Sequence, residues 1–426
     1  MTKVFSYTQA IQADIVDAFC VLQKGFTDQF VYYDKHHKTR FMGLGRCIAL
    51  RSLHEVESVL QGEAAEEPVF FSFNRFDAEN PLPPDDLTQA FPRLRLLLPE
   101  VVLIENGRGS FLQTNSLGPV YAGRVERFAR QVSCAPERVR TEITYSLEAD
   151  SRAGWNEAVS AGLAAIEVGR VEKVVLSRRV RLVVAHPFSS KDLLVNLIDG
   201  PSRGTVLLYR YGDVFFCGCT PELLVRKRGL EVEGMCLAGT TGAGGSKAER
   251  ARLAERLLCD EKNLREHAFV VDFIREVFRR NCHGVRIALQ PEILALQHVQ
   301  HLYTPAFAQV MEGVSLNGLV KQLHPTPALA GTPVGEALML IRQIEGYNRG
   351  FFGGPCGYMD AAGDGEFSVG LRTGVFDGEM GWLYAGCGIV ADSEADAEYD
   401  ETDMKLKTIL SAFDGRNETG GSYGKK

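Results

Sequence analysis

The chain has 426 residues, enough for about three domains of average size. Hydrophobic residues make up 45% and charged residues 24%, ordinary values for a globular protein that argue against a disordered or fibrous chain. Lys and Arg number 47 against 54 Asp and Glu, giving a net charge of −7, which argues against a protein that coats nucleic acid. An anionic ligand must therefore be held by a local site.

No stretch approaches the ~20 apolar residues of a membrane-spanning helix, and the N-terminus lacks the continuous apolar run of a signal peptide. The ten cysteines are scattered, and the tightest pair, Cys217 and Cys219, lacks the spacing of a zinc or redox motif. We therefore expect reduced thiols and a cytoplasmic protein, with no membrane and no nucleic-acid partner.

Residues 1–140 carry the weaker structural pattern. Segments 41–50 and 69–76 are rich in β-forming residues and predict strands, and the apolar run at 101–104 continues this pattern. Residues 125–131 are compatible with either a short helix or an extended link. This part of the chain therefore indicates sheet, without a clear order of strands.

The pattern becomes clearer from residue 150 onward. Apolar periodicity predicts helices at 156–169, 246–259, 262–280, 335–345 and 395–412. Strands are predicted at 173–177, 206–209, 214–217, 367–375 and 382–390. Because strands come mostly as hairpins with helices grouped between them, we expect an α+β fold with antiparallel sheet. The polar residues 413–426 are expected to form a disordered tail.

Two glycine-rich segments come close to phosphate-binding motifs without completing them. In residues 239–246 no lysine precedes Ser246, and residues 386–391 are followed by acidic residues instead of a helix signal. Neither segment therefore predicts nucleotide binding. Both offer unobstructed backbone N–H groups, which suit a carboxylate.

Two ionisable residues stand in apolar surroundings. Lys173 begins a predicted strand; it could be an edge lysine that prevents aggregation, or a buried lysine that acts as a base. Glu222 follows an apolar strand; it could meet solvent in a turn, or apolar neighbours could raise its pKa and make it a general acid. The local pattern leaves both questions open.

Three glutamates on two helices are candidate metal ligands. Glu266 lies near the buried face of the helix predicted at 262–280, and Glu398, Glu401 and Lys405 share one face of the last helix. Glu401 and Lys405 could form an ordinary surface ion pair. Alternatively, the two helices could present carboxylates to one Mg²⁺ ion, which prefers oxygen ligands. Spacing alone does not decide between these interpretations.

An arginine and several histidines are further candidates. Arg372 interrupts an apolar strand, so we expect it to pair with a carboxylate of the protein or of a ligand. His324 precedes a proline, and it could either hydrogen-bond a ligand or be structural. His298 and His301 lack an acidic partner at zinc-binding spacing, and we interpret both as structural.

Nine segments recur in a characteristic order: 173–178 (KVVLSR), 221–224 (PELL), 237–240 (LAGT), 262–266 (KNLRE), 323–328 (LHPTPA), 349–354 (RGFFGG), 371–373 (LRT), 384–390 (YAGCGIV) and 398–402 (EYDET) with Lys405. Together they resemble the chorismate-utilising enzymes, isochorismate synthases most closely. The resemblance implies one large α+β domain over residues 1–412, in which two facing, mostly antiparallel sheets carry helices outside. Residues 1–140 would be its divergent part and 150–412 its catalytic, chorismate-binding part.

The resemblance also implies roles for individual residues. Lys173 would deprotonate a water that attacks C2 of chorismate, and Glu222 would protonate the departing C4 hydroxyl. Glu266 and Glu401 would hold Mg²⁺, with Glu398 helping through a water. The remaining substrate-binding residues would be Gly239, Thr240, His324, Arg372, Gly386, Gly388 and Lys405.

The implied activity is that of an isochorismate synthase, an isomerase whose product would feed menaquinone, siderophore or salicylate synthesis. Related enzymes that use ammonia carry glutamine in place of Lys173, so the lysine favours water and argues against a glutaminase subunit. Two alternatives remain: a salicylate synthase, which would add pyruvate elimination, and a non-catalytic chorismate-binding homologue. We expect a monomer.

Overall fold

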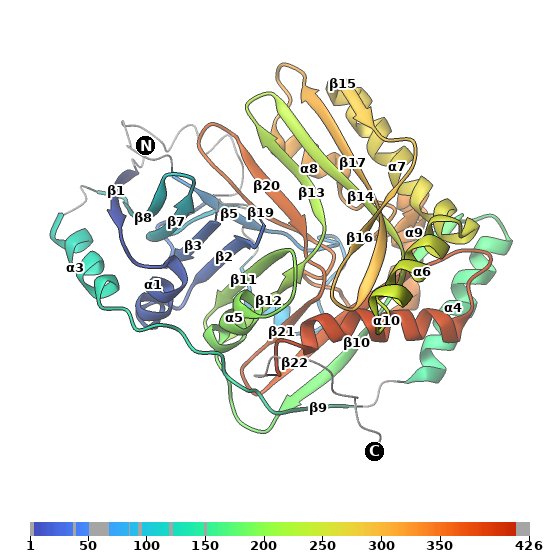
Figure 1. Cartoon of the computed structure of the whole chain (residues 1–426), viewed down its shortest axis with the longest axis horizontal. Coiled ribbons are helices and arrows are strands. Elements are labelled where there is room, and N and C mark those ends of the chain that lie inside the picture. The colour runs from blue at the N-terminus through green and yellow to red at the C-terminus, as the bar shows by residue number, and fades with distance from the viewer. Residues whose placement is uncertain are drawn as a thin grey trace.

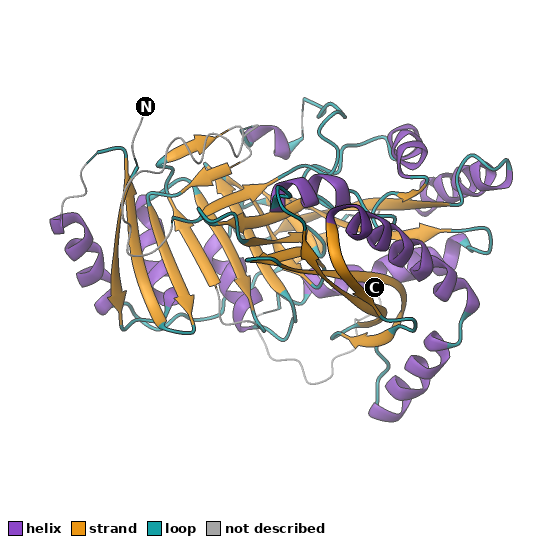
Figure 2. Cartoon of the chain, turned by 90° about the horizontal axis from the view of Figure 1, so that it is seen from above, coloured by secondary structure: helices purple, strands orange, loops and turns teal. Residues whose placement is uncertain are grey.

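The computed structural model describes residues 4–36, 40–50, 68–84, 86–92, 96–118, 122–148 and 151–414. Two large sheets face each other, and helices lie around them (Figures 1 and 2). All strand pairs in the described part of these sheets are antiparallel. The expected α+β fold with two facing antiparallel sheets is therefore confirmed.

Within the described ranges the larger sheet has 12 strands and draws them from both halves of the chain. In spatial order they are β1 (Phe5–Ile11), β8 (Gly109–Ser116), β7 (Val101–Asn106), β3 (Arg40–Leu44), β2 (Gln29–Asp34), β11 (Thr205–Tyr211), β12 (Val214–Thr220), β21 (Thr373–Phe376), β22 (Met380–Ile389), β10 (Lys173–Val184) and β18 (Gly331–Thr332), with β9 (Tyr145–Leu147) paired to β10. The turn at Gly212-Asp213 joins β11 to β12 in a hairpin.

The smaller sheet has 10 strands and is also mixed in origin. In spatial order they are β15 (Cys282–Ile287), β17 (Val299–Val310), β14 (Glu231–Gly242), β13 (Leu223–Arg228), β20 (Gly365–Val369), β19 (Pro355–Met359), β5 (Phe70–Phe73), β6 (Leu96–Leu98) and β4 (Ile48–Leu50), with β16 (Glu292–Ala295) paired to β17.

The helices follow the predicted apolar periodicity closely. The α-helices are α1 (Ile15–Leu22), α3 (Ala122–Ser133), α4 (Arg152–Glu167), α5 (Ser190–Asp199), α6 (Lys247–Leu258), α7 (Glu261–Asn281), α8 (Leu316–Leu323), α9 (Val334–Ile344) and α10 (Ala395–Leu410), and short 3₁₀ turns span Gln23–Gly25 and Leu87–Ala90. Helices α1 and α5 pack on the larger sheet, and α7 runs along β14 and β17 of the smaller one (Figure 1). Segment 125–131 is thus helical. No helix within the described ranges is both long and apolar enough to cross a bilayer.

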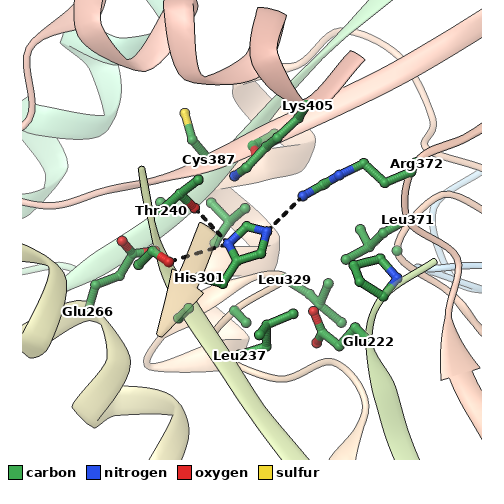
Figure 3. Close-up of a pocket in the computed structure, with 18 of the residues that line it drawn as sticks. Glu222, Leu237, Thr240, Glu266, His301, Leu329, Leu371, Arg372, Cys387 and Lys405 are labelled. Atoms are coloured by element: carbon green, nitrogen blue, oxygen red, sulfur yellow. Dashed lines mark hydrogen bonds between the residues drawn. The ribbon is translucent and has the colours of Figure 1, made fainter. Parts of the chain in front are cut away.

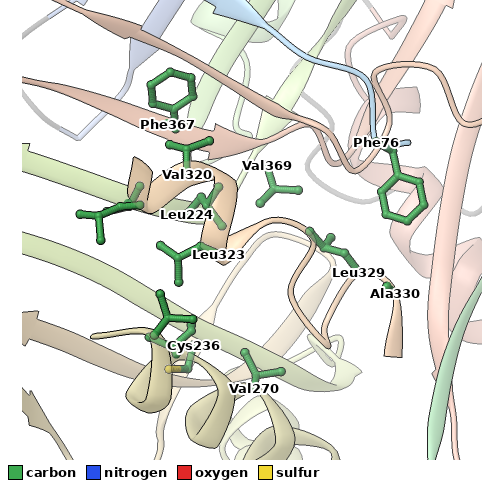
Figure 4. Packing of buried hydrophobic residues seen from close by; sticks show 14 of the residues in the cluster. Phe76, Leu224, Cys236, Val270, Val320, Leu323, Leu329, Ala330, Phe367 and Val369 are labelled. Carbon is green, nitrogen blue, oxygen red and sulfur yellow. The ribbon is translucent and has the colours of Figure 1, made fainter. Parts of the chain in front are cut away.

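Buried side chains form an aromatic layer between the sheets and apolar clusters under the helices. Phe30, Tyr209 and Phe351 belong to the layer, in which rings contact each other at centroid distances of 4.4–5.8 Å. Figure 4 shows a second cluster, in which Val270 of α7 and Leu323 of α8 meet the smaller sheet. This packing holds α7 in a fixed position beside the sheet.

Two predictions about chain path are wrong. The single strand expected at 367–375 is two strands, β20 and β21, which belong to different sheets. The chain crosses between the sheets at Arg372, the only non-glycine residue of the described ranges with a positive φ, 55°. Phe413, expected in a disordered tail, is fully buried against Phe188 and Phe376. Residues 415–426 lie outside the described residues.

Candidate active site

A cavity opens where α7, α10 and strands of both sheets converge (Figure 3). Its volume is about 650 Å³ with the solvent-open mouth included. Eight of the twelve residues that the sequence singled out line it: Glu222, Gly239, Thr240, Glu266, Arg372, Gly386, Gly388 and Lys405. The structure thus brings together residues spread over almost 200 positions of the chain.

Lys173 lies at the start of β10 and pairs with a carboxylate of the cavity wall. Its side chain is 0% exposed, and its Nζ lies 3.0 Å from Oε1 of Glu266 on α7. The edge-lysine interpretation is therefore wrong. Burial is the largest influence and by itself would raise the pKa of Glu266. The charge and hydrogen bond of Lys173, together with the charges of Lys405 and Lys262, outweigh it and lower that pKa. A side chain at Gly388 would overlap both members of this pair, so the glycine gives them room.

Glu222 lies between β12 and β13, on the other side of the cavity from Glu266 (Figure 3). It is only 5% exposed, so the solvent-facing turn is also wrong. Burial raises the pKa of Glu222 to about 7, against the opposing charges of Arg372 and Lys173. A carboxyl group that still holds its proton near neutral pH is suited to general acid catalysis.

Arg372 is a buried cation that has no anionic partner in the part of the chain that the structure describes. Within the described residues it makes no ion pair, its Nε has no hydrogen-bond partner, and burial lowers its pKa to about 10. Its Nη2 lies 3.3 Å from Nε2 of His301. On the other edge of that ring, Nδ1 lies 3.1 Å from Oγ1 of Thr240 and 3.3 Å from the carbonyl oxygen of Gly239 (Figure 3).

His301 is the functional residue that sequence reasoning missed. Burial, reinforced by the charges of Arg372 and Lys405, holds its pKa well below the ordinary value, so the ring is neutral. We infer that Nδ1 carries the proton, because only then can it donate to the Gly239 carbonyl while Nε2 accepts from Arg372. From the sequence His301 is interpreted as structural; the structure places it in the lining of the cavity. The signal that identifies it is the pairing of His301 with Thr240 across β17 and β14, which no local pattern contains.

His324 is placed differently from the prediction. Its Nε2 lies 2.9 Å from the carbonyl oxygen of Phe76, its ring packs edge-on against the Phe76 ring, and it is not among the residues that line the cavity. Burial lowers its pKa to about 4, which keeps the ring neutral. Nε2 of His324 therefore bonds to the backbone carbonyl of Phe76 in place of a ligand.

The three candidate metal ligands lie on α7 and α10, each beside a lysine. Glu401 lies 2.6 Å from Lys405, and Glu398 lies 2.5 Å from Lys262. Burial, with the neighbouring carboxylates of Glu398 and Glu266, raises the pKa of Glu401 although Lys405 opposes this shift. The Glu401–Lys405 pair is largely buried, so it is not the ordinary surface pair considered above.

These carboxylates fit a Mg²⁺ ion by their chemistry but not by their present arrangement. All three offer oxygen ligands beside the cavity, and positive charge already lies against each of them. Nevertheless, no group of three or more His, Cys, Asp or Glu side chains in the described part of the chain is spaced to hold an ion. The ammonium groups occupy the charge-balancing positions that a cation would take.

A buried ion pair supports the strand that carries Lys173. Glu345 and Arg349 lie 2.5 Å apart, with side chains only 2% and 3% exposed. Arg349 donates to the carbonyl oxygens of Val175, at 2.7 Å, and Leu329, at 2.9 Å, while Glu345 accepts from the backbone N–H of Ser177 at 2.7 Å. Arg349 also lines the cavity, although the sequence assigned it no role.

The sequence matches the family described as "Chorismate binding enzyme" over residues 1–414. The chain belongs to this family. Isochorismate synthase MenF of Bacillus subtilis is 38% identical over 261 residues, which cover 61% of this chain and 55% of that protein. The salicylate biosynthesis isochorismate synthase of Pseudomonas aeruginosa is 32% identical over 378 residues, 85% of this chain and 78% of that one.

Solved structures share the fold of this chorismate-binding enzyme. The menaquinone-specific isochorismate synthase MenF of Escherichia coli superposes with a TM-score of 0.81 and 23% identity, covering 96% of this chain and 94% of that one. A DhbC from Bacillus anthracis gives a TM-score of 0.74 at 24% identity, covering 91% and 96%. The alignment with the Bacillus subtilis MenF, by contrast, spans little more than half of that protein's length.

Proposed function

We propose that this chain is an isochorismate synthase, an isomerase that converts chorismate to isochorismate. The observation that carries the proposal is the buried Glu222 in the cavity wall, across from Glu266, whose carboxylate pairs with the fully buried Lys173. Relatives named isochorismate synthases in Bacillus subtilis and Pseudomonas aeruginosa support it. The salicylate synthase and the non-catalytic homologue have no comparable observation in their favour.

The two groups would exchange one water for another at the ring. Lys173 accepts a proton from a water whose oxygen bonds to C2, while the ring double bonds shift toward C4. The C4–oxygen bond then breaks, and Glu222 donates its proton so that the hydroxyl leaves as water. One water enters, one leaves, and the substrate is isomerised.

Chorismate carries two carboxylates, and the cavity offers cations for both. Arg372, which has no carboxylate partner in the described protein, binds one of them, assisted by Lys405, Thr240 and the backbone around Gly386 and Gly388. His301 holds the Arg372 guanidinium in place. The other carboxylate faces the side of the cavity where Glu266 and Glu401 would hold Mg²⁺, with Glu398 acting through a water.

When bound, Mg²⁺ would neutralise the ring carboxylate and so stabilise charge that develops on the ring. Glu401→Gln should therefore weaken metal binding, and unchanged metal dependence would place the ion elsewhere.

We also propose that the enzyme is a cytoplasmic monomer. It works without a glutaminase subunit, because the lysine at position 173 favours water as the nucleophile.

The direct test is incubation of the full chain with chorismate and Mg²⁺, followed by chromatographic separation of the products. We expect isochorismate. Recovery of unchanged chorismate would contradict the proposal, and release of one pyruvate per chorismate would indicate a salicylate synthase.

Lys173→Ala should lower turnover by about 10²–10⁴-fold, the usual contribution of general acid–base catalysis, while calorimetry still detects chorismate binding. Lys191→Ala is the control, since this lysine lies at the start of α5, outside the cavity lining. Near-wild-type turnover of Lys173→Ala would show that another group is the base.

A further inference from the structure

Three carboxylates of the proposed metal site are neutralised by three lysines. Lys173 lies 3.0 Å from Glu266, Lys405 lies 2.6 Å from Glu401, and Lys262 lies 2.5 Å from Glu398. Each lysine occupies one carboxylate, so the charges at these six positions sum to zero. A divalent cation that binds here must therefore compete with the ammonium groups for these carboxylates.

The three lysines differ in how easily they can leave. The side chain of Lys173 is 0% exposed and that of Lys405 is 10% exposed, and Lys405 also donates to the carbonyl oxygen of Gly386 at 2.8 Å. Lys262 is 31% exposed, whereas its partner Glu398 is only 3% exposed. An ammonium group on a flexible, half-exposed chain can move into water at low cost, but the carboxylate it leaves stays behind.

Lys262 also acts on more than its direct partner. Its charge interacts with Glu266 and Glu401 as well as with Glu398. It has no backbone acceptor in the described protein that would hold it, in contrast to Lys405, and it lies one helical turn before Glu266 on α7. Lys262 is therefore placed to neutralise the whole carboxylate group from its solvent side.

We propose that Lys262 is the exchangeable counter-ion of the metal site: it holds Glu398 in the metal-free protein and moves into solvent when a divalent cation enters. This inference rests on the proposed function, because it takes the three carboxylates as the Mg²⁺ site. Lys262 acts through Glu398 and is a positioning residue. Its charge weakens metal binding to the free protein, since a dication must enter against it.

The test is direct titration of the purified full chain with Mn²⁺ alone, at pH 8 and without chorismate, with free Mn²⁺ measured by electron paramagnetic resonance. Lys262→Gln should bind Mn²⁺ about fivefold more tightly than wild type, or better, as expected for coupling between neighbouring charges. Lys262→Arg keeps the charge and should stay within about twofold of wild type.

The matched control is Arg265→Gln on the same helix. Arg265 carries the same charge, but it is half-exposed and pairs with the exposed Asp392, 3.3 Å away, so its loss should change Mn²⁺ affinity by less than about twofold. This comparison separates the local ion pair from the general effect of removing one positive charge from α7.

Unchanged or weaker Mn²⁺ binding by Lys262→Gln would overturn the inference, as would equal gains in Lys262→Gln and Arg265→Gln. Far-ultraviolet circular dichroism verifies that each variant is folded, and Lys262→Arg tests the same position without loss of charge. The product assay with chorismate tests the proposed function separately. If the wild type turns over chorismate but Lys262→Gln leaves Mn²⁺ affinity unchanged, only this inference is rejected.

Discussion

Burial assigns the roles of the single residues at this site. Lysine and glutamate are ordinary surface residues, but Lys173 is fully enclosed and Glu222 is nearly so. Enclosure near a carboxylate keeps Lys173 beside Glu266, whereas enclosure among apolar neighbours keeps the proton on Glu222. The two groups thus lie in different electrostatic surroundings, one beside an opposite charge and the other where burial dominates.

The pKa of Glu222 makes a prediction about stability. In the unfolded chain this carboxyl ionises near pH 4.5, but in the folded protein only near pH 7, so stability is lost as pH rises through this window. Glu222→Gln removes this loss. The free energy of unfolding of Glu222→Gln minus that of wild type should increase by roughly 2–3 kcal/mol from pH 5 to pH 8, as measured by urea denaturation.

Glu231→Gln, the same chemical change at an exposed position of β14, serves as the control and should show no such trend. A Glu222→Gln difference that is independent of pH would mean that Glu222 ionises normally in the folded protein. Glu222→Gln should also lose isomerase activity, since the amide cannot donate a proton to the leaving hydroxyl in the way an acid does.

At the scale of elements, side chains complete an edge of β10 that the sheet leaves open. Strand β22 pairs with β10 from Val174 to Val183, but on the other edge β18 pairs only with residues 173 and 174. The N–H of Val175 still donates to the carbonyl oxygen of Ala330, but its carbonyl oxygen accepts from Arg349, and the N–H of Ser177 donates to Glu345. The ion pair therefore takes the place of a neighbouring strand just beyond Lys173.

Removing one member of this pair should be costly. Glu345→Gln leaves the buried Arg349 without its counter-charge and should lower the free energy of unfolding by about 3–5 kcal/mol. Because the edge of β10 is then less fixed, kcat should fall more than KM rises. Thermal unfolding and steady-state kinetics measure both effects.

The comparison for Glu345→Gln is Arg152→Gln, which breaks an exposed, solvent-screened pair with Asp396 and should cost far less stability. A Glu345→Gln protein as stable as the Arg152→Gln protein would show that the buried pair contributes little.

At the scale of the whole molecule, both sheets join the two halves of the chain. In the larger sheet, β2 pairs with β11, so residues 29–34 lie beside residues 205–210. In the smaller sheet, β5 pairs with β19. We therefore propose that the N-terminal 140 residues and the catalytic part form one domain, because neither half can complete its sheets alone.

This arrangement predicts a single cooperative unfolding transition. In urea, hydrogen exchange followed by mass spectrometry should give the same global opening free energy for peptides of α1–β2 as for peptides of β11–β12. Opening of the N-terminal peptides at clearly lower urea than the β11–β12 peptides would show that the two parts unfold separately.

The amino-acid sequence by itself determined the local elements and the chemistry of most site residues. The apolar repeat of α7 predicts residues 262–280, and the structure has Glu261–Asn281. This succeeds because helix and hairpin patterns depend on neighbours a few positions apart. The nine family segments identified the cavity residues around Glu222 and Glu266 for the same reason, since each segment is short and contiguous.

Only the tertiary structure decided which distant groups meet. Strand pairing 61 positions apart brings His301 to Thr240, and the change of sheet at Arg372 cannot be read from an apolar run that continues through it. The pairing of each acidic ligand with a lysine likewise depends on how α7 and α10 pack. Such contacts are set by register and packing between elements, and a local sequence pattern carries neither.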